Sequence, residues 1–133
     1  IEADKSRKGS PMDWASAAIA LHDQHEADAI VIEKNQGGDM CENTLRRAGF
    51  TGRVIAVHAS KGKVLRAEPV VALYEQGLVS HCAGLHDMEE EMMDFDSVSG
   101  LAGGKSPNRV DALVWALTEL SGIGKPAGAL KHW

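Results

Sequence analysis

Apolar and polar residues alternate along this chain with two different periods. Short apolar runs at residues 29–33 and 53–58 predict buried strands. Leu78-Val79 predicts the start of a short third strand. Apolar residues spaced three or four apart predict amphipathic helices, which cover residues 11–26, 38–48, 63–76, 85–95 and 107–120. This alternation of strands and helices favours an α/β core with a parallel sheet.

Local signals mark where several of these helices begin or break. Ser10-Pro11 and Ser106-Pro107 each predict a helix start, because a capping hydroxyl is followed by a proline suited to the first turn. Pro69 predicts a break in the helix over 63–76. Asp39 follows two glycines, and we favour it as a helix cap over a metal ligand. The Gly-rich segment 97–106 predicts a mobile loop.

The composition is that of an ordinary globular domain. The 133 residues include 44% hydrophobic and 25% charged residues and suit one domain. We expect a domain over 1–121 followed by a tail over 122–133. No apolar run approaches the roughly 20 residues of a membrane-spanning helix, and the net charge of −5 argues against a coat of basic charge. Two distant cysteines favour a reducing cytoplasm.

Two acidic residues are candidates for chemistry. Glu33 ends a buried strand, and the carboxyl ends of parallel strands are where ligands gather. Asp111 lies one turn into the last helix, where the helix dipole favours its ionised form. Each has a plainer interpretation. Glu33 could form an ion pair with a lysine, and Asp111 could be a solvated residue that compensates the helix dipole. Two carboxylates at one site would need a cation between them, and Mg²⁺ suits this arrangement.

A set of motifs in order gives these acids a context. Together they closely resemble the nuclease domain of tailed-phage or prophage terminase large subunits over about residues 1–120. The motifs are Asp4-Lys5-Ser6, Gly9-Ser10-Pro11-x-x-Trp14, Glu33-Lys34-Asn35-Gln36-Gly37-Gly38-Asp39-Met40, Ala59-Ser60-Lys61-Gly62-Lys63-x-x-Arg66-Ala67-Glu68-Pro69, Leu73-Tyr74-Glu75-Gln76-Gly77 and Ser106-Pro107-Asn108-Arg109-x-Asp111-Ala112-Leu113-Val114-Trp115-Ala116.

The resemblance implies a function as well as a fold. It implies an RNase H-like fold and a metal-dependent endonuclease that cuts concatemeric double-stranded DNA during viral packaging, by two-metal hydrolysis with Mg²⁺ or Mn²⁺. Glu33 and Asp111 match two of the family's three metal-binding acids. The implied partners are DNA, an upstream ATPase domain of the same polypeptide, the portal and the small terminase subunit. The implied location is the cytoplasm of a bacterial host, with no membrane partner.

The third acid of the family belongs to a first strand that would precede Ile1. The chain therefore reads as an N-terminally truncated RNase H-like domain. Loss of that strand would expose the edge of the strand that carries Glu33, so we expect either pairing with another copy in a homo-oligomer or marginal stability. We also expect this chain to cleave DNA weakly or not at all by itself.

Several further residues are candidates for supporting roles. Asn108 lies one helical turn before Asp111 and could orient a water or a metal ligand, since it does not titrate. Lys61, Lys63 and Arg66 follow the second strand and could hold DNA phosphates. Alternatively, Arg66 could pair with Glu68 or Glu33 and fix the helix. Lys105, in the Gly-rich loop, could also meet DNA.

Other functional classes remain as alternatives. The chain could be a catalytically incomplete prophage remnant that acts only as a docking module. It could also be an unrelated nucleotide-binding protein that uses Gly37-Gly38 as an anion site. Gly104-Lys105-Ser106 resembles the end of a phosphate-binding loop. However, Ser99 stands where that loop requires its first glycine, and no strand is predicted before it, so we reject ATP binding at this loop. A zinc site at His81, Cys82 and His86 would lack a second ligand pair.

Overall fold

The computed structural model describes residues 1–34 and 39–123, and these fall into two compact units. We call the described residues of 5–60 the strand unit, and those of 1–4 and 61–123 the helical unit. Each unit has its own hydrophobic core. None of the helices formed by the described residues is long and apolar enough to cross a membrane.

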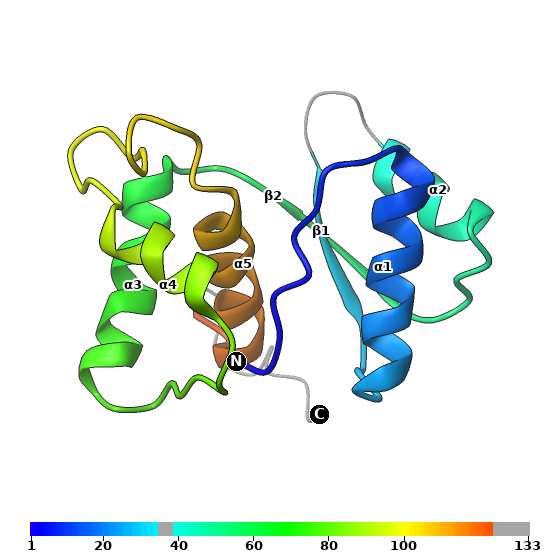
Figure 1. Ribbon diagram of the computed structural model, residues 1–133, viewed down its shortest axis with the longest axis horizontal. Coiled ribbons are helices and arrows are strands. Elements are labelled where there is room, and N and C mark those ends of the chain that lie inside the picture. The colour runs from blue at the N-terminus through cyan, green and yellow to red at the C-terminus, as the bar shows by residue number, and fades with distance from the viewer. Residues whose placement is uncertain (35–38, 124–133) are drawn as a thin grey trace. The chain divides into compact units, whose positions relative to one another are not determined.

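The strand unit contains a parallel pair of strands and two helices (Figure 1). Strand β1 (Ile30–Lys34) pairs in parallel with β2 (Val54–His58), so that Glu33 lies opposite Val57. Helix α1 spans Pro11–Gln24 and helix α2 spans Met40–Arg47. The prediction of an α/β core with parallel strands is confirmed.

The core of the strand unit fixes which way β1 faces. Ile32 is 8% exposed and packs with Ala15 of α1, Leu45 of α2 and Phe50 after α2. Because successive side chains of a strand point to opposite faces, Glu33 lies on the face opposite to this core. Glu33 is exposed at the carboxyl end of the strand.

The predicted start of α1 is confirmed by a reciprocal pair of hydrogen bonds. The backbone N–H of Asp13 donates to the Ser10 hydroxyl at 3.3 Å, and the Asp13 carboxylate accepts from the Ser10 N–H at 2.8 Å. These hydrogen bonds from Ser10 hold the pKa of Asp13 below its ordinary value. A local sequence signal is thus sufficient to set this helix end.

The preferred role of Asp39 as a helix cap is wrong. Asp39 stands at the N-cap position of α2, but its side chain makes no capping hydrogen bond to any described residue. Its carboxylate lies 2.5 Å from the Lys34 ammonium at the end of β1. The hydrogen bond and charge of Asp39 raise the pKa of Lys34. An ion pair with the preceding strand has replaced local capping.

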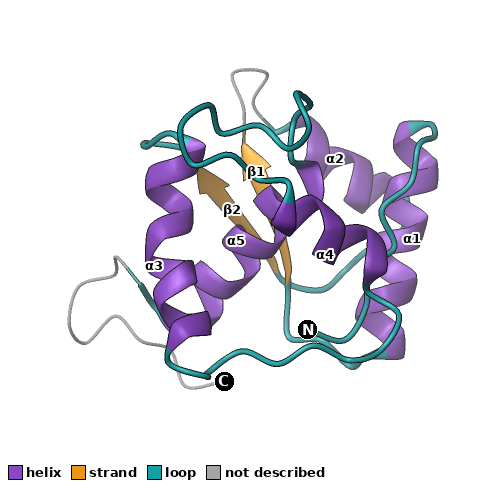
Figure 2. Ribbon diagram, turned by 60° about the vertical axis from the view of Figure 1, so that its left-hand side comes forward, coloured by secondary structure: helices purple, strands orange, loops and turns teal. Residues whose placement is uncertain are grey.

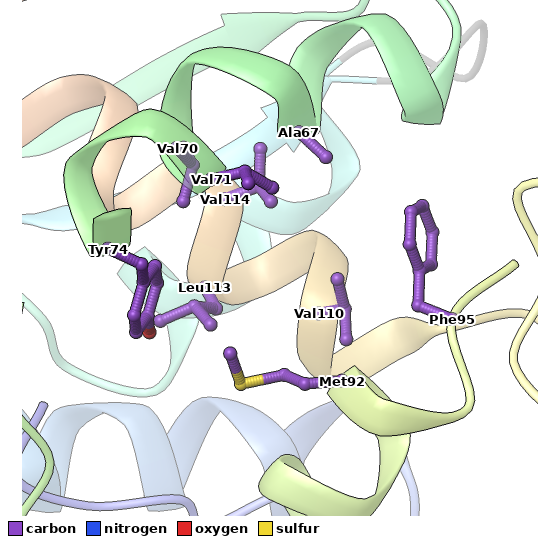
Figure 3. Close-up of a pocket in the computed structure, with 9 residues that line it drawn as sticks. All are labelled: Ala67, Val70, Val71, Tyr74, Met92, Phe95, Val110, Leu113 and Val114. Carbon is purple, nitrogen blue, oxygen red and sulfur yellow. The ribbon is translucent and has the colours of Figure 1, made fainter. Parts of the chain in front are cut away.

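Three helices make up most of the helical unit (Figure 2). They are α3 (Lys63–Glu75), α4 (His86–Met93) and α5 (Asn108–Ser121). Their buried side chains form one core: Ala67, Val70, Leu85, Met88, Val110, Leu113, Val114 and Leu117. Figure 3 shows an apolar pocket of about 90 Å³ in this unit, with side chains from α3, α4 and α5 and Phe95 around it.

Two predicted features of the helical unit are wrong. Helix α3 continues through Pro69 without a break. Buried Ala67 and Val70 on either side of Pro69 anchor the helix in the core, which offsets the missing N–H. Residues 78–82 form no strand. Instead, the Cys82 N–H donates to the carbonyl oxygen of Ile1 at 2.8 Å, so this segment pairs with the first residue of the chain.

The Gly-rich loop, predicted to be mobile, is crossed by hydrogen bonds. Asp96 accepts from the Val98 N–H and from the Ser99 hydroxyl, both at 2.8 Å. Ala102 and Lys105 exchange two backbone hydrogen bonds of 2.9 Å. Side-chain acceptors and tight turns therefore give this segment a defined path.

Ser106 is not the cap of α5, contrary to the prediction from Ser106-Pro107. The N-cap position is Pro107, and the helix begins at Asn108. The Ser106 hydroxyl instead forms hydrogen bonds with side chains, one of them from α3. The shift of one residue thus makes a polar group available beside the first turn of α5.

Candidate functional site

Asp111 is the centre of the charged cluster at the start of α5. Its N–H donates to the carbonyl oxygen of Pro107 at 2.8 Å, which fixes it in the first turn of the helix. Its side chain is 18% exposed, and two cations of α3 face its two oxygens. The Lys63 Nζ lies 3.0 Å from Oδ2, and the Arg66 Nη2 lies 3.8 Å from Oδ1. The ionised carboxylate is therefore matched by positive charge.

The Lys63 ammonium lies between two oxygen atoms. Besides Asp111, it donates a hydrogen bond of 2.9 Å to the Ser106 hydroxyl. That hydroxyl in turn donates to the Asn108 Oδ1 at 3.0 Å. Because a hydroxyl that donates to Asn108 turns its lone pairs elsewhere, Asn108 orients Ser106 to accept from a cation. Asn108 thus acts through Ser106 in this arrangement.

Arg66 is held more firmly than a typical surface arginine. Its side chain is 11% exposed, and its guanidinium carbon lies 4.8 Å from the centre of the Trp115 ring. A cation at this distance from an indole face is attracted by the ring electrons. Asp111 and Trp115 are one helical turn apart on α5, so both contact Arg66 from one helix face. Arg66 therefore joins α3 to α5 through Asp111 and Trp115, two partners that the sequence interpretation did not name.

The oxygens around the Lys63 ammonium fit a metal cation. A carboxylate and a hydroxyl are hard oxygen donors, which Mg²⁺ and Mn²⁺ prefer, and here they already face a positive charge. Within residues 1–34 and 39–123, no group of three or more His, Cys, Asp or Glu side chains could hold a metal ion. Asp111 and Ser106 supply two oxygen donors, fewer than a complete ligand set needs.

A second cluster holds the first turn of α5 from another side. Arg109 donates from Nε to the Asp4 carboxylate at 2.9 Å, and its Nη1 lies 3.9 Å from the Glu91 carboxylate. Glu91 also accepts from the Val110 N–H at 2.6 Å. Asp4, which the sequence left unassigned, is thus a structural partner of α5. The cluster fixes the helix turn that carries Asp111.

Three further predicted site residues are Glu33, Lys61 and Lys105, and the two lysines are neighbours of Lys63 and Ser106 in the sequence. Glu33 belongs to the strand unit, at the end of β1. Lys61 is exposed just before α3, and Lys105 is exposed in the turn that pairs with Ala102. The proposed anion site at Gly37-Gly38 lies outside the described residues.

His81 has structural partners of a different kind from those of a zinc site. Its Nε2 lies 2.6 Å from the Tyr74 hydroxyl, and its Nδ1 lies 3.1 Å from the Glu89 carboxylate. Burial raises the pKa of Tyr74, and the charge of Glu89 adds to the rise. The three side chains join α3, the following segment and α4.

Sequence reasoning missed the roles of Ser106 and Trp115. The sequence predicts Ser106 as a helix cap, although Lys105 and Asn108 nearby place its hydroxyl among polar residues. Trp115 carried a clearer signal, because it follows Asp111 by four residues and so shares its helix face. Neither signal identifies the partner on α3, which only the packing of the two helices provides.

Comparison with known proteins is consistent with this arrangement. A family model described as the terminase RNaseH-like domain matches residues 1–120. No curated protein and no solved structure matches the chain. The match covers both strands, all five helices except the end of α5, and every candidate residue discussed above. The described residues form an α/β structure with a parallel strand pair, and the chain belongs to the terminase RNase H-like domain family.

Proposed function

We propose that this chain is the metal-dependent endonuclease domain of a viral DNA-packaging terminase, which cuts concatemeric double-stranded DNA by two-metal hydrolysis. Membership of a terminase nuclease-like family supports the proposal. One observation in the structure carries it: the Lys63 ammonium lies between the Asp111 carboxylate and the Ser106 hydroxyl. Such an oxygen set is suited to Mg²⁺ or Mn²⁺.

Glu33 and Asp111 are the carboxylates that we assign to the metal ions. Glu33 is exposed at the carboxyl end of a parallel strand, where catalytic groups of α/β proteins gather. Asp111 lies in the first turn of a helix, and Lys63 and Arg66 face its two carboxylate oxygens. When bound, divalent cations would supply charge stabilisation for the phosphodiester and lower the pKa of a water. Asn108 serves this site by orienting the Ser106 hydroxyl.

Basic residues of the helical unit would position the DNA backbone. Lys61 and Lys105 are exposed and can contact phosphates directly. Lys63 and Arg66 lie against Asp111, so they would act beside the scissile phosphate. Such contacts position DNA without reading its sequence.

Further partners follow from the same proposal. The domain would act as part of a longer polypeptide with an ATPase domain, and with the portal and small terminase subunit, in the cytoplasm of an infected bacterium.

The described strands form a sheet of only two, so a further strand could extend it. That strand would come either from upstream sequence or from a second copy in a homo-oligomer. Light scattering on the purified chain distinguishes a monomer from a homo-oligomer.

Cleavage of linear double-stranded DNA in Mn²⁺ tests the proposed activity. The full-length polypeptide that contains this chain should cleave, whereas the chain alone should cleave weakly or not at all. In the full-length polypeptide, Glu33→Ala and Asp111→Ala should each lower the rate of DNA cleavage at least about 100-fold. Glu90→Ala, which removes an exposed acid of α4, is the matched control and should cleave normally.

Two results would contradict the proposal. If both alanine variants cleaved like the parent, the assignment of the metal-binding acids would be wrong. If the full-length polypeptide did not cleave in Mn²⁺ or Mg²⁺ while remaining folded, a docking role would replace the nuclease role.

A further inference from the structure

We infer that Lys63 is an exchangeable cation: it neutralises Asp111 while no metal is bound, is displaced by a divalent cation, and only then becomes available to a DNA phosphate. This inference deepens the proposed function and rests on it. The position of the Lys63 ammonium supports it, because that ammonium occupies the place between Asp111 and Ser106 that a cation would take.

The charges explain why Lys63 belongs there in the metal-free protein. The Asp111 carboxylate is 18% exposed, so an uncompensated charge would be costly. Arg66 lies beyond hydrogen-bonding distance of this carboxylate, at 3.8 Å, while Lys63 is within it at 3.0 Å. Lys63 is therefore the closer of the two counter-charges.

The two cations differ in how easily they can leave. The Arg66 side chain is 11% exposed and lies over the Trp115 ring, whereas the Lys63 side chain is 35% exposed. Lys63 also stands at the first position of α3, so its flexible side chain can turn toward solvent without disturbing the helix. Arg66 is thus the fixed counter-charge and Lys63 the mobile one.

Displacement by a metal has a simple electrostatic basis. At equal distance a divalent cation interacts with a carboxylate about twice as strongly as an ammonium does. The ammonium now contacts Asp111 Oδ2 and Ser106 Oγ. A metal held by these residues would need the same oxygens, so it would compete with the ammonium. The released ammonium would lie near the metal-bound carboxylate, where the DNA backbone is expected. Lys63 would therefore contact DNA only when the site holds metal.

Mn²⁺ binding to the purified protein without DNA is the first test. Electron paramagnetic resonance of free Mn²⁺ gives the dissociation constant. Lys63→Met removes the charge and keeps an unbranched side chain one atom shorter, and should tighten Mn²⁺ binding by about threefold to tenfold. Lys63→Arg keeps the charge and should bind like the parent. Lys8→Met is the matched control, since it removes the charge of an exposed lysine in the strand unit, and should change the constant less than about twofold.

Chemical modification of lysine is the second test, and it separates displacement from simple repulsion. Acetylation followed by mass spectrometry reports the reactivity of each amine. Saturating Mg²⁺ should raise the rate at Lys63 at least about threefold over that at Lys61, because an amine that has left the contacts with Asp111 and Ser106 is more accessible to the reagent. An unchanged Lys63 rate would overturn the inference, even if Lys63→Met bound Mn²⁺ more tightly.

Asp111→Asn distinguishes failure of this inference from failure of the proposed function. If Asp111→Asn abolishes Mn²⁺ binding while Lys63→Met leaves it unchanged, the exchange is wrong and the metal site remains. If Asp111→Asn binds Mn²⁺ as the parent does, Asp111 is not a metal ligand, and both the proposed metal site and the exchange at Lys63 are wrong.

Discussion

Arg109 donates a hydrogen bond of 2.9 Å to Asp4, joining the start of α5 to a residue 105 positions earlier in the chain. The two side chains are 31% and 13% exposed, and Glu91, at 14%, lies 3.9 Å from the same guanidinium. A single arginine therefore neutralises two mostly buried carboxylates. Arg109 is in the same helix turn as Asp111, so its ion pairs also hold the turn that carries the candidate site.

Arg109→Gln should lower the free energy of unfolding by about 1–3 kcal/mol, because it leaves Asp4 and Glu91 without their shared counter-charge. Urea unfolding measures the change. Arg47→Gln removes an exposed arginine from the end of α2 and should stay within about 0.5 kcal/mol of the parent. Equal losses in the two variants would show that the Arg109 cluster does not stabilise the fold.

Pro69→Ala should raise the free energy of unfolding by about 1–3 kcal/mol. Alanine restores the N–H that can donate to the carbonyl of Leu65 inside α3, and this gain exceeds the loss of chain stiffness in the unfolded state. Pro11→Ala is the matched control, because Pro11 is the first residue of α1, where no such hydrogen bond forms. Thermal unfolding should show little gain for that variant. A lower melting temperature for Pro69→Ala would indicate that the ring itself is required for packing.

Asp96→Asn should lower the melting temperature at neutral pH, with a difference that disappears in acid. Hydrogen bonds from Val98 and Ser99 hold the pKa of Asp96 below its ordinary value. The folded state therefore binds this proton more weakly than the unfolded state. The stabilisation is complete above the unfolded pKa of about 3.9 and is lost as the pH falls through the lower folded pKa.

Melting temperatures of the parent and the Asp96→Asn variant between pH 7 and pH 2.5 measure this effect. Asp94→Asn removes an exposed carboxylate two residues earlier and serves as the control. A pH-independent difference between parent and Asp96→Asn would rule out the charge of Asp96 as the cause.

Tyr74 should ionise above the ordinary range for tyrosine, because burial first and the Glu89 charge second raise its pKa. The folded state then binds the phenolic proton more tightly than the unfolded state. Its contribution to stability is present below about pH 10 and is lost as the pH rises through the raised folded pKa. Absorbance at alkaline pH reports Tyr74 alone, since the chain has one tyrosine.

The same titration in denaturant gives the unperturbed midpoint for comparison. Glu89→Gln should remove the smaller, electrostatic part of the shift and leave the part due to burial. A folded midpoint equal to the denatured one would contradict the burial of the hydroxyl.

Much of the fold could be predicted because its signals are local. The Ser10–Asp13 capping box needs only four consecutive residues, and the apolar runs of β1 and β2 are identifiable from their alternation with helices. The errors arose where tertiary contacts changed the local preference. Asp39 pairs with Lys34 instead of capping α2, and α3 continues through Pro69 because buried neighbours hold it.

The candidate site was less accessible to sequence reasoning. Asp111 stood out through its motif and its place in a helix, and Lys63 and Arg66 were chosen for their charge. Their contact depends on how α3 packs against α5, which no local pattern encodes. Long flexible side chains add to the difficulty, because each can reach several partners with similar energy.

The pairing of Cys82 with Ile1 has a consequence for biosynthesis. Residues 5–60 are synthesised as one uninterrupted stretch, whereas the helical unit needs both residues 1–4 and residues from position 61 onward. The strand unit can therefore be complete on the ribosome before all residues of the helical unit have been synthesised. Residues 1–4 must stay available until Cys82, which follows α3 in the chain, has been synthesised.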